Sequence, residues 1–537
     1  MSESPAPTPA PTGPTPDFAG QQALIASLLD PAAYPHPVDA VHVVETHISW
    51  VLLAGAYAYK IKKAVRLGFL DFSSTTGRMR FCAEEIRLNQ RLAAEIYLDV
   101  VAIVATPDGP RVGIAGPAVE HAVRMHRFDE NDTLDRMIDD GRADAGIVDA
   151  LAGRIARFHR EAPRAQGTHP WGTPESILGA ALDNVTALAA LPVAAQIREP
   201  LGTLATWTRE TAARLDTAFV ARREAGFIRE CHGDLHPGNV AVIGGAPVPF
   251  DCIEFNESFR WIDVMSEIAF PVMDLDCHGH PDWAWRLLNG YLEATGDFDG
   301  LSVLRFYVVY RALVRAKVRA LAAATGGRAD PAENRNLRSA LAHVDTARRW
   351  STPAAPFMVL MHGLSGSGKS TLARRIAEGL GAVVIRSDVE RKRLHGLEPR
   401  EASGSGCDAG IYGSAETAAT YARLERLAAT ILRSGFSVVV DAAFLRRSER
   451  RGFAALGREA RVPFAVAACA GSVAQFAERI RRRAAAGTDA SEATVDVLHR
   501  QTGFTEPIGG DEADRTFRFD GIDDGAMLDR IAACLRS

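Results

Sequence analysis

The sequence predicts two domains of different class, an α+β domain followed by an α/β domain with a parallel sheet. A Pro- and Ala-rich stretch at 351–356 has no hydrophobic periodicity, which is typical of a linker. In residues 21–350 short apolar runs come first and helical patterns follow, which indicates a small sheet lobe and a helical lobe. In residues 357–537 apolar strands alternate with amphipathic helices, which predicts a parallel sheet covered on both faces.

The hydrophobic pattern places the elements of both domains. In the first domain it predicts a hairpin at 48–61, a helix at 78–94, strands at 100–105 and 111–114, and helices over 133–270 interrupted by a strand–loop–strand at 231–251. In the second domain it predicts strands at 357–362, 383–386, 437–440, 464–469 and 516–519, and helices at 370–379, 415–433, 473–483 and 526–535.

Composition and charge exclude several classes of protein. The chain has 537 residues and a net charge of −5, so no global basic field attracts nucleic acid or anionic lipid. No uncharged apolar run reaches the length of a membrane span, so we expect no membrane partner. Residues 1–20 are rich in Pro, Ala and Thr and lack a signal-peptide pattern, which predicts a disordered tail. The seven cysteines form no C-x-x-C pair, which favours free thiols and a cytoplasmic location.

The segment 363–370, Gly-Leu-Ser-Gly-Ser-Gly-Lys-Ser, fits the P-loop pattern between a predicted strand and a predicted helix. Its backbone N–H groups would converge on the phosphates of ATP, Lys369 would reach the β- and γ-phosphates, and Ser370 would hold Mg²⁺. Asp441 ends a later apolar strand and would orient the same Mg²⁺. The alternatives are a glycine-rich turn without a ligand and an Asp that only caps a helix. The expected nucleotide-binding residues are Gly363, Ser365, Gly366, Ser367, Gly368, Lys369, Ser370 and Thr371.

Asp388 follows the second strand of the same predicted sheet, three residues before Arg391. This region resembles small P-loop kinases such as gluconate kinase, shikimate kinase, polynucleotide kinase and the zeta toxins. The resemblance implies that Asp388 contacts or deprotonates the acceptor hydroxyl and that Arg391 binds acceptor groups. The alternative is a capping box formed by Ser387 and Glu390, in which Asp388 only favours the helix N-terminus.

A cluster of arginines precedes the turn at 484–489. In the related kinases a basic helical lid closes over the phosphates at this place, so Arg479 or Arg483 would stabilise charge on the transferred group. The alternative is a solvated basic helix face.

The loop 232–239, His-Gly-Asp-Leu-His-Pro-Gly-Asn, is the second strong motif. It places Asp234 and Asn239 five residues apart, as in the kinase pattern H-R-D-x-x-x-x-N. Asp234 would accept the proton of the acceptor hydroxyl, and Asn239 and Asp251 would hold Mg²⁺. The alternative is a loop with one structural His and a capped turn. The motif resembles aminoglycoside phosphotransferases and their choline, homoserine and fructosamine kinase relatives, which implies a protein-kinase-like bilobal fold for the first domain.

A lysine near the start of the chain completes this expected site. Lys60 and Lys62 lie on one face of the predicted strand 57–63, and one of them should bridge the α- and β-phosphates; we choose Lys60. Its expected partner is Glu85, which begins a core-facing helical stripe, and Glu84 is the alternative. If the hairpin lies at an edge of the sheet, both lysines are surface residues instead.

The combination of the two domains resembles bacterial proteins described as bifunctional aminoglycoside phosphotransferase/ATP-binding proteins; residues 59–63 and 68–72 look characteristic of that group. This resemblance implies an ATP- and Mg²⁺-dependent kinase that phosphorylates a hydroxyl of a small polar metabolite. Two other interpretations stay open. One domain could be a non-catalytic ATP-binding regulatory module, or the P-loop domain could phosphorylate nucleic-acid ends, which the low basicity disfavours. The sequence reveals neither the acceptors nor the oligomeric state.

Overall fold

The computed structural model describes residues 13–14, 17–68, 70–167, 169–325, 331–405, 410–486, 489–520 and 524–536. The chain forms two compact units. The first unit comprises Met1–Ile147, Glu161–Gly172 and Gly226–Glu267, and the second comprises Val148–Arg160, Thr173–Ala225 and Ile268–Ser537. Of the tail predicted at 1–20, residues 1–12, 15 and 16 lie outside the described residues.

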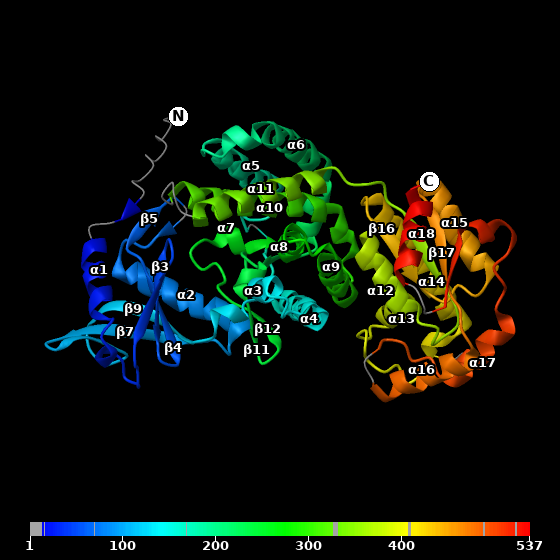
Figure 1. Ribbon diagram of the computed structural model, residues 1–537, viewed down its shortest axis with the longest axis horizontal. Coiled ribbons are helices and arrows are strands. Elements are labelled where there is room, and N and C mark those ends of the chain that lie inside the picture. Colours follow the sequence, from blue (N-terminus) through cyan, green and yellow to red (C-terminus); the bar gives the residue numbers. More distant parts are fainter. Residues whose placement is uncertain are drawn as a thin grey trace. The chain divides into compact units, whose positions relative to one another are not determined.

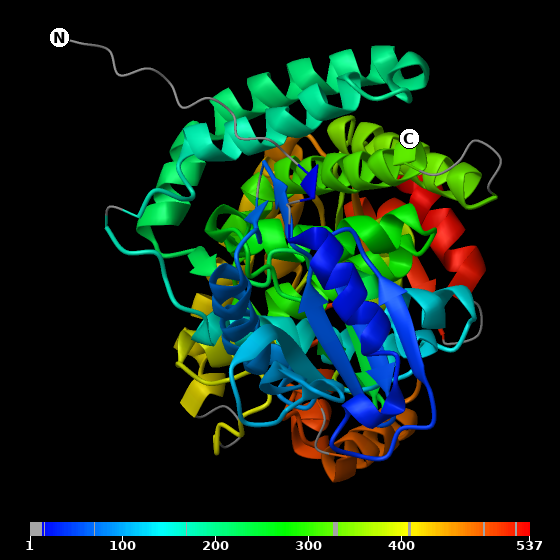
Figure 2. The same cartoon turned by 90° about the vertical axis from the view of Figure 1, so that its left-hand side faces the viewer.

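A six-stranded antiparallel sheet, in the order β2-β3-β4-β9-β7-β8, forms the largest sheet of the first unit (Figures 1 and 2). Its strands are β2 Val41–Glu45, β3 Ser49–Ala54, β4 Tyr57–Lys62, β7 Tyr97–Thr106, β8 Gly109–Val112 and β9 Ala118–His126. The hairpin predicted at 48–61 is β3–β4. Because β4 lies between β3 and β9, its lysines are not on a sheet edge.

Helices cover both faces of this sheet. The helices of the first unit are α1 Phe18–Ser27, α2 Thr75–Ala93, α3 Leu134–Asp139 and α7 Glu257–Arg260. Tyr59 and Ile61 of β4 pack in the same apolar cluster as Ile25 of α1. Ala58 instead joins Cys82 of α2 in a second cluster. Because neighbouring residues of a strand face opposite sides, α1 and α2 cover opposite faces, and even-numbered residues of β4 face α2.

Short antiparallel pairings complete the first unit. Their strands are β1 Gly13–Pro14, β5 Val65–Leu67, β6 Leu70–Asp71, β10 Ile228–Glu230, β11 Val240–Ile243, β12 Ala246–Pro249 and β13 Trp261–Asp263. Strand β10 pairs with β13, and β11 pairs with β12. The loop 231–239 therefore leaves from a paired strand, and Asp251 follows a closed hairpin. The first unit thus contains the sheet predicted for the kinase-like domain, whereas most of the helices predicted to follow that sheet belong to the second unit.

The helical part of the second unit comes before the linker predicted at 351–356. The helices that lie largely there are α4 Ala145–Glu161, α5 Pro174–Ala189, α6 Ala194–Glu224, α8 Val264–Cys277, α9 Pro281–Thr295, α10 Leu301–Thr325 and α11 Pro331–Ser351. Across the described part of the chain, each helix is either too short or too polar to cross a lipid bilayer.

A five-stranded parallel sheet, in the order β15-β16-β14-β17-β18, confirms the α/β class predicted for the end of the chain (Figure 1). Its strands are β14 Met358–His362, β15 Ala382–Arg386, β16 Ser437–Asp441, β17 Phe464–Cys469 and β18 Thr516–Phe519. Its helices are α12 Lys369–Leu380, α13 Ser387–Leu394, α14 Ser414–Arg433, α15 Arg447–Ala460, α16 Val473–Ala486, α17 Val495–Phe504 and α18 Asp524–Arg536.

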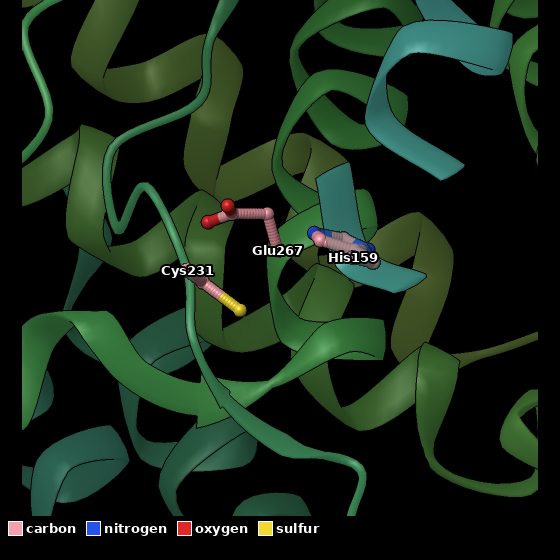
Figure 3. Close-up of side chains that lie close together, drawn as sticks. All are labelled: His159, Cys231 and Glu267. Atoms are coloured by element: carbon pink, nitrogen blue, oxygen red, sulfur yellow. The ribbon is translucent and has the colours of Figure 1, made fainter. Parts of the chain in front are cut away.

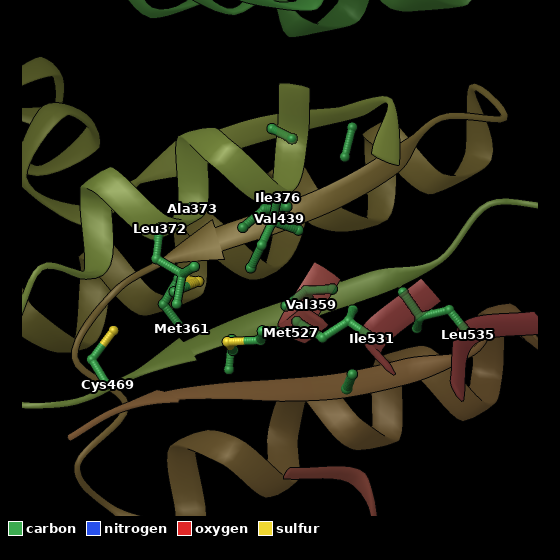
Figure 4. Packing of buried hydrophobic residues seen from close by; sticks show 14 residues of the cluster. Val359, Met361, Leu372, Ala373, Ile376, Val439, Cys469, Met527, Ile531 and Leu535 are labelled. Carbon is green, nitrogen blue, oxygen red and sulfur yellow. The ribbon is translucent and has the colours of Figure 1, made fainter. Parts of the chain in front are cut away.

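A buried apolar cluster fixes the helix that follows the P-loop (Figure 4). Leu372 and Ile376 lie four residues apart, so they share one face of α12. That face packs on Val359 and Met361 of β14 and on Ile531 of α18. Each fully buried aliphatic side chain stabilises the fold by roughly 1.5–3 kcal/mol. The N-terminus of α12, where the P-loop ends, is therefore held against the sheet.

Candidate functional site

Asp234 and Asn239 meet on the loop that follows β10. The Asn239 Nδ2 donates to the Asp234 backbone oxygen at 3.0 Å and to the Asp234 Oδ2 at 3.1 Å. A 3-10 helix at Pro237–Asn239 folds the chain back, and His236 caps it by accepting from the N–H of Gly238. Because the Asn239 nitrogen is used in these bonds, its Oδ1 is the atom suited to contact a cation.

Glu267, in the first turn of α8, holds the start of this loop. Its carboxylate accepts from the backbone N–H groups of His232 at 2.6 Å and Gly233 at 2.8 Å. Figure 3 shows Glu267 beside the segment that carries Cys231, whose Sγ lies within 4.8 Å of the carboxylate. Gly233 has a φ of +92°, and a Cβ there would lie 2.7 Å from the Phe259 oxygen, so this position requires glycine. Sequence reasoning missed Glu267, because an acidic residue at a helix start also suits simple capping.

Asp251 lies next to Lys60. Its carboxylate contacts the Lys60 Nζ at 2.5 Å, and Lys60 also donates to Glu85 at 2.8 Å. The Asp251 N–H donates to the Tyr97 Oη at 3.2 Å. Asp251 has a φ of +66°. A residue with a side chain pays on the order of 1–3 kcal/mol for such a conformation, and these residues cluster at functional sites.

The ion pairs set the charge state of these groups. Burial alone would lower the pKa of Lys60, but the charges of Asp251 and Glu85 raise it well above its ordinary value. Burial alone would raise the pKa of Asp251, but Lys60 holds it below its ordinary value. Both side chains are therefore charged at neutral pH, and Lys60 presents a cation that suits phosphate oxygens.

The geometry distinguishes between the lysines and glutamates left open by the sequence. The Glu85 Oε1 accepts from Lys60 at 2.8 Å, and its Oε2 accepts from Lys62 at 2.6 Å. Glu84 instead pairs with Arg87 at 2.7 Å. The Lys62 side chain is 1% exposed and that of Lys60 is 12% exposed. Lys60 is therefore the more accessible of the two lysines.

The oxygen donors of the first unit fit a hard divalent cation. The Asp234 and Asp251 side chains are 37% and 43% exposed, so both carboxylates are accessible. Together with the Asn239 Oδ1 they provide the carboxylate and amide oxygens that Mg²⁺ binds in proteins. Sulfur and imidazole donors are absent from this set of three, which also suits Mg²⁺.

The P-loop connects β14 to α12. Gly366 and Gly368 have φ values of +78° and +97°, and a Cβ at Gly366 would lie 2.5 Å from the Phe476 oxygen. These positions therefore favour glycine. The Lys369 Nζ donates to the Leu364 oxygen at 2.8 Å within the loop. Burial lowers the pKa of Lys369.

Asp441 lies at the end of β16 and Ser370 lies in the first turn of α12, and both line the same cavity. Burial raises the pKa of Asp441, although Arg386, whose Nε lies 3.5 Å away, lowers it. The same arginine pairs with Asp489 at 3.0 Å. The carboxylate and the hydroxyl thus form one oxygen pair beside Lys369, and this pair fits a hard cation.

A cavity of about 420 Å³ lies over the P-loop. The P-loop residues that line it are Ser365, Gly366, Gly368, Lys369, Ser370 and Thr371. Asp388, Arg391 and Asp441 line it as well. Gly363 and Ser367 are not part of the lining; Gly363 donates to the Ala443 oxygen, and Ser367 is buried. The cavity therefore brings the predicted phosphate, cation and acceptor residues of this unit together.

Asp388 lies in the first turn of α13. The helix begins at Ser387, its N-cap is Arg386, and no side chain caps it. Glu390 pairs with Arg423 at 2.5 Å. The capping box considered for this segment does not form, and Asp388 is left to face the cavity.

The arginines around the cavity differ in their contacts. Arg391 donates to the Thr417 Oγ1 at 3.2 Å and is largely buried. Arg479 donates to the backbone oxygen of Ser367 at 3.1 Å, so it contacts the P-loop directly. Arg483 donates to the Ala493 oxygen at 3.1 Å and lines the cavity.

Gln501 of α17 was not predicted. Its Oε1 accepts from the Ser365 N–H at 2.8 Å, at a P-loop group expected to meet a phosphate. The two residues are 136 positions apart, and a lone glutamine on a helix carries no sequence signal.

The chain is similar to several known proteins. A family model described as an AAA domain matches residues 358–508, which contain the P-loop, Asp388 and Asp441. An uncharacterized protein of Mycobacterium tuberculosis is 33% identical over 463 residues, which cover 85% of this chain and 89% of that protein.

Two solved structures match different parts of the chain. A gluconokinase from Sinorhizobium meliloti is 24% identical, with 34% of this chain and 94% of that chain covered and a TM-score of 0.24. A choline/ethanolamine kinase family protein from Mesorhizobium loti is 11% identical, with 61% of this chain and 99% of that chain covered and a TM-score of 0.35.

Proposed function

The chain belongs to the same family as the uncharacterized protein of Mycobacterium tuberculosis, and we propose that it is an ATP-dependent phosphotransferase with two nucleotide sites. Each site would move the γ-phosphoryl group of ATP to a hydroxyl of a small polar metabolite. The observation that carries the proposal is the cavity shared by the P-loop, Asp441 and Asp388. The Lys60–Glu85–Asp251 contacts and the Asp234–Asn239 pair support the second site.

In the second unit, the P-loop N–H groups and the N-terminus of α12 would bind the β- and γ-phosphates together with Lys369. The hydroxyl oxygen of the acceptor would attack the γ-phosphorus while the bond between this phosphorus and ADP breaks. Asp388 would accept the proton of that hydroxyl. Arg391 would orient the acceptor. Arg479 is the better placed of the two lid arginines to stabilise the transferred charge, because it already contacts the P-loop.

In the first unit, Lys60 would bind the α- and β-phosphates, held by Glu85. Asp234 would accept the hydroxyl proton, and its hydrogen bond from Asn239 keeps the carboxylate oriented. Glu267 fixes the backbone of the same loop. Transfer therefore depends on positioning and charge stabilisation, without a covalent intermediate.

Both units offer ligands for Mg²⁺. Asn239 and Asp251 would hold it in the first unit, and Ser370 and Asp441 in the second. Bound there, Mg²⁺ neutralises phosphate charge.

The test is ADP release by the full-length chain from ATP and MgCl₂, with pools of hydroxyl-bearing metabolites as acceptors. Asp234→Asn and Lys369→Ala should each abolish turnover of a different acceptor. Removal of a general base costs about 10²–10⁴-fold in rate, which sets the effect expected for Asp234→Asn. Asp99→Asn is the control. Asp99 forms an ion pair with Arg124 at 2.7 Å, and neither residue belongs to the proposed sites. This variant should leave turnover unchanged.

The same experiment distinguishes the other interpretations. If one of the two variants leaves all phosphorylation intact, that half is a nucleotide-binding module and not a transferase. If phosphate from ATP is incorporated at oligonucleotide 5′ ends and depends on Lys369, the acceptor of the P-loop half is a nucleic acid and not a metabolite.

A further inference from the structure

Strand β4 is tied to the loop after β12 by two ion pairs. Lys60 contacts Asp251 at 2.5 Å, and Lys62 contacts Glu254. Both lysines face α2, since they lie two residues apart on the strand. Glu85 of α2 joins the two pairs into one chain of alternating charges, because its two oxygens accept from the two lysines separately.

The two ends of this charge chain differ in their access to solvent. The Asp251 and Lys60 side chains are 43% and 12% exposed, whereas those of Glu254 and Lys62 are 4% and 1% exposed. The Lys62 ammonium also lies 5.1 Å from the ring of Phe72. Removing one partner of a buried ion pair is strongly destabilising, because it leaves an uncompensated charge. Opening the Lys62–Glu254 pair is therefore costly, whereas the Lys60–Asp251 pair is accessible to a ligand.

The exposed pair must separate if the first unit works as proposed above, and this inference rests on that proposed function. Asp251 would hold Mg²⁺ and Lys60 would bind phosphates, yet each is now bound to the other. We propose that Lys62 and Glu254 are positioning residues. They hold Glu85 and the loop 251–254 in place while the Lys60–Asp251 pair opens. Asp251 then binds the metal instead of Lys60, and Lys60 binds phosphate instead of Asp251.

The other contacts of the loop 251–254 do not replace the positioning by Lys62 and Glu254. The N–H groups of Asp251 and Cys252 donate to the Tyr97 Oη at 3.2 Å and to the Asn89 Oδ1 at 2.9 Å. At the far end of the loop, the Ile253 N–H donates to the His232 oxygen at 3.0 Å, and the Arg260 Nη1 donates to the Glu254 backbone oxygen at 3.3 Å. All of these bonds fix the backbone only, so none of them holds the Glu254 carboxylate or balances the charge of Glu85. Lys62 does both, since it contacts Glu254 and Glu85 at once.

The experiment measures binding of the ATP analogue AMP-PNP by calorimetry, with and without MgCl₂. It uses the full-length chain carrying Lys369→Ala, so that the P-loop site does not dominate the signal. The quantity compared is the gain in affinity that Mg²⁺ produces. Loss of groups that orient metal ligands typically costs 10–100-fold in metal affinity, so we expect Glu254→Gln to reduce the Mg²⁺-dependent gain by about tenfold or more. Affinity without Mg²⁺ should change much less.

Lys63→Gln is the matched control. Lys63 is the next residue after β4, and its partner Glu45 is 62% exposed. This variant should keep the full Mg²⁺-dependent gain. The double variant Lys62→Met/Glu254→Gln removes both charges of the buried pair, which proteins tolerate better than loss of one partner. It should fold and still lose the gain, which distinguishes positioning from a purely structural role.

Asp251→Asn in the same background separates failure of this inference from failure of the proposed function. If Asp251→Asn loses the Mg²⁺-dependent gain while Glu254→Gln and the double variant keep it, Lys62 and Glu254 are structural only and the inference is wrong. If Asp251→Asn keeps the gain too, the first unit does not hold the metal through Asp251, and both the proposed site and the inference fail.

Discussion

At the scale of single residues, Lys60 and Lys62 show what the sequence can and cannot predict. Strand alternation predicts that both face the same side, and helical periodicity favours Glu85 over Glu84 as the partner of Lys60. The sequence does not predict that Lys62 forms a buried ion pair with Glu254. The two residues are 192 positions apart, and such a contact follows from the tertiary fold alone. The same holds for Glu267, which contacts residues of the loop 232–239 that lie 34 and 35 positions away in the chain.

His343 of α11 is a buried charged residue outside the proposed sites. Its Nδ1 bonds to the Ser339 oxygen at 2.7 Å, and its Nε2 bonds to the Asp274 Oδ1 at 3.2 Å. Both partners are acceptors, so both ring nitrogens carry a proton. Burial alone would lower the pKa of His343, but hydrogen bonds to Asp274 and Cys277 raise it to about 9.

This raised pKa predicts a pH-dependent contribution of His343 to stability. Because the folded pKa lies above the ordinary value of 6.5, the contribution is fully present below pH 6.5 and is lost as pH rises through about 9. The shift corresponds to about 3 kcal/mol. Urea unfolding of the wild type and of His343→Gln should therefore differ most near about pH 6 and least near about pH 9.5. A difference that stays constant or grows with pH would contradict the assignment.

At the scale of elements, strands that form continuous apolar runs are easier to predict than an edge strand that contains a proline. Strands β14 and β16 were predicted to within one residue, because strands covered on both faces appear as continuous apolar runs. The strand predicted at 111–114 is β8 Gly109–Val112 instead. Thr106, the residue before the turn, pairs with Gly109, the residue after it. Because the turn has only two residues, β8 begins earlier in the sequence than the positions of its apolar residues predict. Pro110 is tolerated because β8 is an edge strand, but a proline argues against a strand when only the sequence is read.

The tight approach of the P-loop to α16 gives an element-scale prediction. Gly366→Ala introduces a side chain at a φ of +78° and within 2.5 Å of the Phe476 oxygen. Gly396→Ala is the matched control, because Gly396 has a φ of +72° and no neighbouring atom within 4 Å of an added Cβ. Both variants should lose about 1–2 kcal/mol of unfolding free energy through backbone strain.

Only Gly366→Ala should also lose nucleotide affinity at the P-loop, because α16 or the loop itself must shift. AMP-PNP binding and thermal unfolding of both variants measure the two effects separately. Equal nucleotide affinity in the two variants would show that the contact with α16 does not shape the phosphate-binding loop.

At the scale of the whole molecule, the sequence predicts both fold classes because each domain carries a long motif in its expected context. The P-loop lies between a strand and a helix, and the loop 232–239 leaves a paired strand. The sequence does not predict how helices group into compact units. Residues 173–225 and 268–351 belong to the same unit as the P-loop sheet, and this grouping follows from packing between distant segments.

We propose that one chain binds two nucleotides, through Lys60 in the first unit and Lys369 in the second. The stoichiometry of AMP-PNP bound to the full-length chain in MgCl₂ tests it most directly. We expect two nucleotides per chain for the wild type and one for each of Lys60→Met and Lys369→Ala, because each lysine contributes to one site only. A single nucleotide per wild-type chain, or two nucleotides retained by either variant, would contradict the account.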